Sequence, residues 1–210
     1  MAIKYPSPRV TLYAETNLPT QYGTFRVLVF RNTIDNKEHL AIVHGTPEVH
    51  QPVAVRIHSE CLTSEVLGSL KCDCREQLQT ALRYIRQEPA GVVLYMRQEG
   101  RGIGLGNKIR AYALQEKGYD TVEANHKLGF PDDLRRYDIA ALMLRKLGIH
   151  SVRLLTNNPQ KLSGLSQHGI EVVERLPIQI VPNDLNEDYL RTKACKSGHL
   201  LSFQPSSIAG

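Results

Sequence analysis

The sequence predicts an α/β protein, in which a β-rich N-terminal part joins a C-terminal part of alternating strands and helices. Three observations support this prediction. Short apolar stretches separated by turn-forming residues fill residues 1–58. Apolar residues recur at helical spacing from about residue 76. Beyond that point the two patterns alternate, which is typical of a mixed sheet flanked by helices.

Four short strands are expected in the N-terminal part. Residues such as Pro19, Gly23, Asn32, Asn36 and Gly45 are expected to form the turns between them. The predicted strands are Val10–Tyr13, Phe25–Phe30, His39–Val43 and Val53–Ile57.

The C-terminal part begins with an amphipathic helix, because Leu78, Ala81, Leu82 and Ile85 fall at i, i+3, i+4 and i+7. We expect residues 1–200 to form one domain and residues 201–210 to form a flexible tail. The other predicted elements are strands at Val92–Met96, Ser151–Leu155 and Glu171–Arg175, and helices at Asn107–Lys117, at Tyr137–Leu147 and from Pro159 toward Gly169.

Composition excludes several classes of protein. The chain has 210 residues, 41% hydrophobic and 22% charged, and a net charge of +5. This excludes a disordered tail, a collagen-like fibre and a disulfide-rich mini-protein. No apolar run approaches the ~18–20 residues that span a bilayer, and the N-terminus lacks a signal-peptide pattern. We therefore expect a cytoplasmic protein without a membrane or nucleic-acid partner. The modest basic surplus suits a compact anion such as a nucleotide.

Three cysteines lie close together as Cys61-x10-Cys72-x-Cys74, while Cys195 stands far away. Three thiolates can bind Zn²⁺ and leave its fourth position for water, as in catalytic zinc sites. A structural zinc would usually show a second cysteine pair, which the sequence lacks. Cys195 could be a fourth ligand, although nothing in its local sequence supports this. The alternative is three buried free cysteines, which are common in protein cores.

His58 and Glu60 precede the first cysteine. His-x-Glu begins the signature of zinc nucleobase deaminases, but the second half, Pro-Cys-x-x-Cys, does not match. His58 is either a ligand or a hydrogen-bonded histidine at a strand end. Glu60 is either a general base or a solvated carboxylate.

A glycine-rich loop, from Arg97 to Gly106, lies between a predicted strand and a predicted helix. Neither common phosphate-binding glycine code fits it. The loop is therefore either a tight turn or a site where backbone N–H groups approach an anion. Arg97 and Arg101 favour the anion, because arginine grips phosphate oxygens in bidentate fashion.

Other polar residues have two interpretations each. Tyr112 is a core or interface aromatic, or a functional one. Asp133 and Arg135, in PDDLRRYD, belong to a solvated charge run or to a site. Thr156 and Lys161 follow a predicted strand at the end where α/β sheets bind ligands, although a helix cap would explain the segment as well.

Taken together, four stretches resemble GTP cyclohydrolase II, which opens the imidazole ring of GTP at the start of riboflavin synthesis. They cover roughly residues 50–200 in the family's order, and four motifs in sequence are highly specific. The stretches are RIHSECLTSEVLGSLKCDC, RQEGRGIGLGNKIRAYALQEKGYDTVEAN, LGFPDDLRRYDIAALML and RLLTNNPQK.

The resemblance implies one zinc ion per subunit held by Cys61, Cys72 and Cys74, together with Mg²⁺ on the triphosphate and a homodimer. It implies that Tyr112 is catalytic and favours the full reaction. It implies that Asp133 is a proton acceptor and that Arg135 is the nucleophile at the α-phosphate. It implies GTP contacts from Arg56, His58, Ser59, Glu60, Gln77, Glu99, Gly100, Arg101, Thr121, Thr156 and Lys161.

Two points complicate the resemblance. Arginine stays protonated in proteins and is a poor nucleophile, so Arg135 is either a nucleophile assisted by Asp133 or an electrostatic clamp. Arg75 stands where the family pattern has glycine, which questions the backbone geometry of the loop. Two other functions stay open: a relative acting on another nucleotide, and a zinc-stabilised binding module without catalysis.

Overall fold

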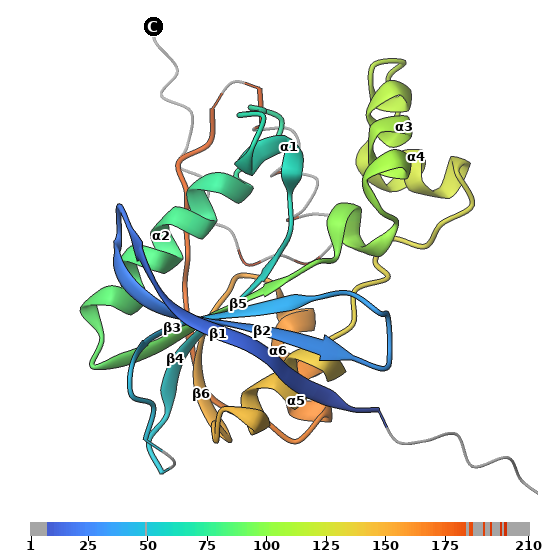
Figure 1. Ribbon diagram of the computed structural model, residues 1–210. Coiled ribbons are helices and arrows are strands. Elements are labelled where there is room, and N and C mark those ends of the chain that lie inside the picture. Colours follow the sequence, from blue (N-terminus) through green and yellow to red (C-terminus); the bar gives the residue numbers. More distant parts are fainter. Residues whose placement is uncertain are drawn as a thin grey trace, which may run out of the picture.

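The computed structural model describes residues 8–48, 50–183, 185, 186, 191, 194, 198 and 200. Within them the chain forms one seven-stranded mixed sheet of order β1-β2-β3-β5-β4-β6-β7 (Figure 1). The strands are β1 (Val10–Thr20), β2 (Gly23–Asn32), β3 (His39–Gly45), β4 (Val53–Ser59), β5 (Ala90–Met96), β6 (Ser151–Leu155) and β7 (Glu171–Leu176). The helices are α1 (Leu62–Glu65), α2 (Cys74–Gln87), the 3₁₀ turn η1 (Glu99–Gly102), α3 (Leu105–Gln115), α4 (Thr121–Lys127), α5 (Asp138–Lys146) and α6 (Pro159–Gln167).

The sheet has an antiparallel half and a parallel half that share β5. Neighbouring strands are antiparallel from β1 through β2 and β3 to β5, and parallel from β5 through β4 and β6 to β7. The predicted fold class is therefore confirmed. The parallel half matters for function because the carboxyl ends of its strands meet at one edge.

Helices cover both faces of the sheet (Figure 1). On one face α5 and α6 pack against a large core in which Val55, Ile57 and Leu94 are fully buried. On the other face α2 buries Ala81 and Ile85 against Phe25 and Val93 in a smaller core. This follows from the period of two in a strand, since Val93 and Leu94 point to opposite faces. Helices α3 and α4 pack on each other, away from the sheet (Figure 1).

Every predicted strand and helix is present, with differences at the ends. The expectation that Pro19 forms a turn is wrong, because β1 continues through Pro19 to Thr20. Proline is tolerated there because β1 is an edge strand, so the absence of the N–H group that proline lacks removes no hydrogen bond between strands. Sequence reasoning missed α1 and α4. The N-cap of α4 carries a capping box between Asp120 and Glu123, which is a readable signal.

Cys195 and the predicted tail, residues 201–210, lie outside the described residues. Of the helices that the structure describes, none has the length and apolar character required to cross a membrane.

Candidate active site

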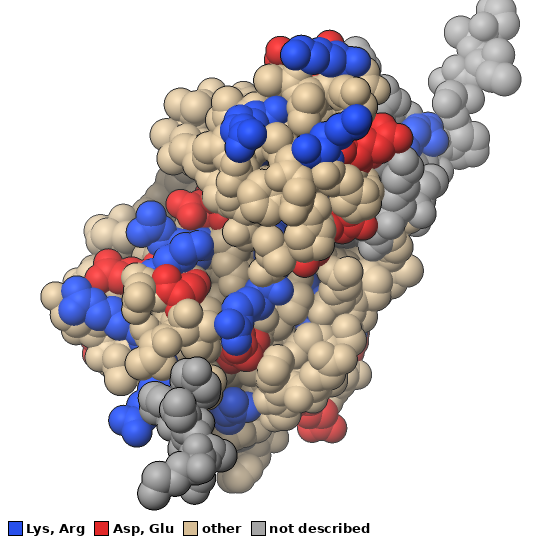
Figure 2. Space-filling model, turned by 90° about the vertical axis from the view of Figure 1, so that its right-hand side faces the viewer, with Lys and Arg blue, Asp and Glu red and all other residues tan. Residues whose placement is uncertain are grey.

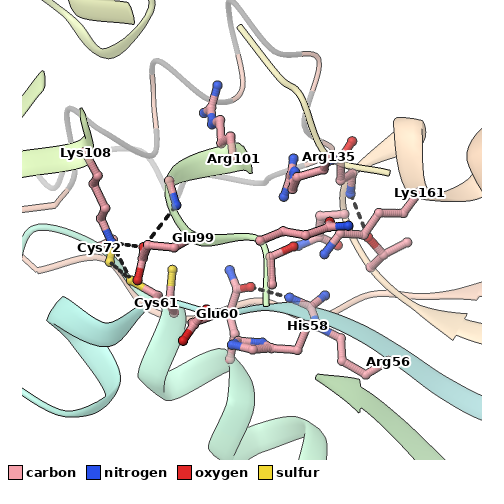
Figure 3. Close-up of a pocket in the computed structure, with 18 of the residues that line it drawn as sticks. Arg56, His58, Glu60, Cys61, Cys72, Glu99, Arg101, Lys108, Arg135 and Lys161 are labelled. Carbon is pink, nitrogen blue, oxygen red and sulfur yellow. Dashed lines mark hydrogen bonds and ion pairs between the residues drawn. The ribbon is translucent and has the colours of Figure 1, made fainter. Parts of the chain in front are cut away.

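A cavity of about 890 Å³, counting its open mouth, lies at the carboxyl ends of the parallel strands (Figure 3). Its walls come from the end of β4, from η1 and α3 after β5, and from the residues after β6. Segments far apart in the sequence thus meet because their strands run in the same direction. The lining includes Arg56, His58, Ser59, Glu60, Cys61, Cys72, Cys74, Gln77, Glu99, Gly100, Arg101, Tyr112, Arg135, Thr156 and Lys161, all predicted from the sequence. The other lining residues are Gln98, Lys108, Asn157, Asn158 and Ile178.

The three cysteines form one cluster at one end of the cavity. Their sulfur atoms lie within 4.8 Å of one another, and the Sγ atoms of Cys61 and Cys72 are 3.6 Å apart. Two thiolates on a tetrahedral zinc with Zn–S bonds of about 2.3 Å would stand about 3.8 Å apart. Cys61 and Cys72 are buried and Cys74 is half-buried. The donor set and its spacing therefore fit a zinc ion.

Lys108 lies beside this cluster, on α3. Its Nζ donates to Cys61 Sγ at 3.0 Å, to Thr63 Oγ1 at 2.9 Å and to Glu99 Oε1 at 2.8 Å. Hydrogen bonds from the neighbouring thiols, reinforced by the Lys108 ammonium, hold the pKa of the Cys61 thiol far below its ordinary value. The hydrogen bond with Cys61 raises the pKa of the Cys72 thiol, so Cys61 is the member of the cluster that is favoured as a thiolate. Sequence reasoning missed Lys108, although its place in the helix after the glycine loop was a signal.

The opposite end of the cavity is rich in cations (Figure 3). Arg56 donates to the carbonyl of Leu155 at 2.9 Å, and Lys161 donates to the carbonyl of Ile57 at 2.7 Å. Burial lowers the pKa of Arg56 to about 10, so it stays charged at neutral pH. Burial, together with the charges of Arg56 and Arg135, lowers the pKa of Lys161 well below 10.5. Such a cluster of buried cations favours a polyanionic ligand.

Arg101 reaches this region through an unusual backbone. Its φ is 58°, in the left-handed region that L side chains rarely adopt, and Gly100 before it has a φ of 62°. Gly102 has a φ of 96°, and a Cβ there would lie 3.0 Å from the backbone of Leu134. The glycine loop is therefore a tight turn that presents Arg101 to the cavity. Non-glycine residues held in this region cluster at functional sites.

Arg135 is anchored by Asp133, which does not line the cavity. Its Nε lies 2.9 Å and 3.0 Å from the two carboxylate oxygens of Asp133, and Nη2 also pairs with Oδ2. Burial alone would raise the pKa of Asp133, but the Arg135 guanidinium outweighs it and lowers the pKa. A carboxylate with a lowered pKa is a weak base, and it stabilises the protonated form of its arginine.

The remaining predicted residues are placed as follows. Gln77, on α2, accepts a hydrogen bond from Arg56 at 2.5 Å and donates one to Asp73 at 2.6 Å. Tyr112, on α3, lines the cavity at its cysteine end, where the ammonium of Lys108 stands 5.7 Å from its ring centre. Burial raises the pKa of Glu60. Thr121 begins α4, accepts from Gln115 at 3.4 Å and does not line the cavity. Its predicted contact with GTP stays a prediction.

Arg75 does not disturb the metal loop. It lies in the first turn of α2, its N–H donates to Ser64 Oγ at 3.1 Å, and its guanidinium pairs with Glu76. Among the described non-glycine residues only Asn36 and Arg101 have a positive φ. The position therefore has no conformational need for glycine.

Polar atoms without partners gather at the cavity. Eight buried side-chain atoms have no hydrogen-bond partner among the described residues, and five of them belong to residues of the lining. Such atoms are costly unless something else satisfies them. The five lining atoms are Arg56 Nε, His58 Nδ1, Ser59 Oγ, Gln98 Oε1 and Asn158 Nδ2.

On the outer face of the molecule that carries α3 and α4, positively and negatively charged side chains are interspersed (Figure 2).

The fold and the cavity thus define an α/β protein in which three cysteines that could hold a metal ion share one pocket with a group of buried cationic side chains. Residues 11–177 match the family model described as GTP cyclohydrolase II. The chain belongs to the GTP cyclohydrolase II family.

Similar proteins agree with this family. The chain is 58% identical over 194 residues to the riboflavin biosynthesis protein RibBA of Bacillus cereus, 57% identical to that of Bacillus mycoides and 55% identical to that of Bacillus cytotoxicus. Each match covers 92% of this chain and 49% of the relative, so the chain spans about half the length of these curated relatives. A solved structure of RibBX, a two-domain 3,4-dihydroxy-2-butanone 4-phosphate synthase from A. baumannii, matches 81% of this chain and 40% of its own, with 23% identity and a TM-score of 0.47. That likeness is too remote to bear on function.

Proposed function

We propose that the chain hydrolyses the imidazole ring of GTP as a zinc-dependent GTP cyclohydrolase II in riboflavin biosynthesis. The products are 2,5-diamino-6-ribosylamino-4(3H)-pyrimidinone 5′-phosphate, formate and pyrophosphate. The observation that carries the proposal is the polarity of one cavity, with three thiols at one end and a cluster of buried cations at the other. A nucleoside triphosphate has the matching polarity, with a base at one end and a polyanion at the other.

Cys61, Cys72 and Cys74 would hold the zinc ion, which makes water nucleophilic near neutral pH. Water adds to C8 of guanine, the C8–N9 bond breaks, and a second water releases the formyl group as formate. Tyr112 lies at this end of the cavity and donates or orients a proton during ring opening. Arg56, Arg101 and Lys161 bind the phosphates, and Mg²⁺ completes their neutralisation.

The resemblance adds further parts to the proposal. They are a homodimer, a cytoplasmic location and a contact of Thr121 with GTP. The residues proposed to contact GTP from the lining are Arg56, His58, Ser59, Glu60, Gln77, Glu99, Gly100, Arg101, Thr156 and Lys161.

The first test is a turnover assay on purified, zinc-loaded protein with GTP and Mg²⁺. We expect equal amounts of formate and pyrophosphate, measured in the same samples. In Tyr112→Phe we expect pyrophosphate without formate, because the ring-opening end of the cavity then lacks its phenol. Bound GTP without either product in the unaltered chain would contradict the proposal and favour a binding module.

The role of Arg135 has its own test. Because Asp133 stabilises the protonated guanidinium, we expect Arg135 to act as a clamp on the α-phosphate while water attacks it. Turnover in H₂¹⁸O places ¹⁸O in the product phosphate in either mechanism, so the covalent adduct is what distinguishes them, and with a clamp none should be trapped. A nucleotide joined through its α-phosphorus to Arg135 in quenched samples, found by mass spectrometry, would show instead that Arg135 is the nucleophile.

A further inference from the structure

Three side chains at the wall of the cavity form a hydrogen-bonded chain. The Tyr95 hydroxyl donates to Glu65 Oε2 at 2.5 Å, and Glu65 Oε1 lies 2.7 Å from His58 Nε2. The His58 side chain is 2% exposed and that of Glu65 is 9% exposed. His58 lines the cavity, whereas Glu65 and Tyr95 do not. The sequence drew attention to His58 but not to the two residues that bind it.

The sheet brings these residues together. His58 and Tyr95 are direct partners in the parallel pair β4–β5, and their rings stack with centroids 5.7 Å apart and an interplanar angle of 23°. Glu65 is the last residue of α1, which follows β4 and returns over the same edge. The chain is therefore held by regular elements, and this fixes the plane of the imidazole ring.

The hydrogen bonds determine where the imidazole carries its proton. The Tyr95 hydroxyl donates to one oxygen of the Glu65 carboxylate, and the other oxygen can accept a hydrogen bond from an Nε2–H group of His58. Nδ1 is buried and has no partner among the described residues, so a proton there would be an unpaired buried donor. Burial, which outweighs the Glu65 hydrogen bond, also lowers the pKa of His58, and Arg56 adds to this shift. The ring is therefore neutral, with its proton on Nε2 and a free lone pair on Nδ1.

His58 Nδ1 is one of three buried lining atoms that can accept a hydrogen bond and have no partner among the described residues, the others being Ser59 Oγ and Gln98 Oε1. Arg56, Arg101 and Lys161 are cationic donors that suit the phosphates, whereas Lys108 is bound at the cysteine end. The base and the ribose of a nucleotide carry N–H and O–H groups as well, which need acceptors. Nδ1 of His58 is an uncharged acceptor, and burial strengthens its hydrogen bond.

We propose that Glu65 and Tyr95 are positioning residues that hold His58 as its Nε2–H tautomer, so that Nδ1 accepts a hydrogen bond from an N–H or O–H group of the bound nucleotide. The identity of the ligand rests on the proposed function, whereas the tautomer does not.

The tautomer is tested first, without turnover. Long-range ¹H–¹⁵N spectra of zinc-loaded protein labelled at histidine, without nucleotide, should show His58 as Nε2–H, with the signal assigned by its loss in His58→Asn. Glu65→Leu removes the acceptor at similar volume and should produce Nδ1–H or a mixture of tautomers. Nδ1–H in the unaltered chain, or an unchanged tautomer in Glu65→Leu, would overturn the proposal.

Kinetics then test the contact with the nucleotide. Losing an aligned acceptor in the cavity should lower kcat/KM for GTP roughly tenfold to a hundredfold in Glu65→Leu and His58→Leu. His58→Asn, whose amide oxygen can take the place of Nδ1, should recover most of this loss, and His58→Gln should not. Glu38→Leu changes an exposed carboxylate before β3 and is the matched control. Equal losses in Asn and Gln variants would refute the acceptor role.

The two proposals fail in different ways. If the unaltered protein releases neither formate nor pyrophosphate, the proposed function fails while the tautomer result stands. If turnover occurs but the tautomer is wrong, only this inference fails.

Discussion

Cys72→Ser is expected to lose bound zinc and to reduce the release of formate to background. Cys72 Sγ is buried 3.6 Å from Cys61 Sγ, so the serine hydroxyl would stand at a ligand position. A hydroxyl is not ionised at neutral pH, and it does not replace a thiolate on zinc. Zinc content after dialysis against a chelator measures the metal, and the turnover assay measures its consequence.

The control for this prediction is Cys195→Ser, which makes the same substitution at the cysteine that stands far from the other three in the sequence. We expect it to retain one zinc ion per chain, because a catalytic zinc keeps its fourth position for water. Zinc retained in Cys72→Ser together with full turnover would refute the metal site. Zinc lost from Cys195→Ser would make Cys195 a fourth ligand and the site a structural one.

Lys161→Met is expected to weaken the use of GTP roughly a hundredfold, seen as a fall in kcat/KM. Lys161 is 4% exposed, so its ammonium acts in a cavity where water screens it little. Methionine keeps most of the side-chain volume and removes the charge. Lys146→Met, at an exposed position of α5, is the matched control and should behave like the unaltered chain.

The pH dependence of the same variant makes the prediction sharper. The pKa of Lys161 lies well below 10.5, because its charged form is buried and faces Arg56 and Arg135. Below this lowered pKa the ammonium attracts the triphosphate, and above it the neutral amine does not. We therefore expect kcat/KM to fall as pH rises through that pKa. In Lys161→Met this component should disappear, and an identical pH profile in both proteins would show that Lys161 does not bind the phosphates.

Local patterns were sufficient for most of the fold. The four N-terminal strands were predicted because turn-forming residues separate short apolar stretches. The helix containing Ile85 was predicted because burial on one face imposes a period of 3.6 on its apolar residues. Pro19 was misjudged because its effect depends on the position of β1 at the sheet edge. Helix α1 was missed because four residues are too few to show a period.

In the candidate site, too, some features could be predicted from local sequence and others depend on the tertiary structure. The cysteine spacing and the glycine-rich loop are local, and both were readable in the sequence. That Arg135 lines the cavity and Asp133 does not was not readable, because it depends on how the segment before α5 folds against η1. Lys108 was missed because a single lysine on a helix is ordinarily a solvated residue.

The sequence by itself determined the fold class, the three candidate zinc ligands and the resemblance to a family, because these depend on residue type and on spacing along the chain. Only the tertiary structure decided that the cysteines and the buried cations share one cavity. Parallel pairing of β4 with β5 and β6 brings their carboxyl ends together, and no local pattern encodes that long-range contact. The same pairing sets His58 against Tyr95, which lies 37 positions away and donates to the Glu65 carboxylate that faces the imidazole.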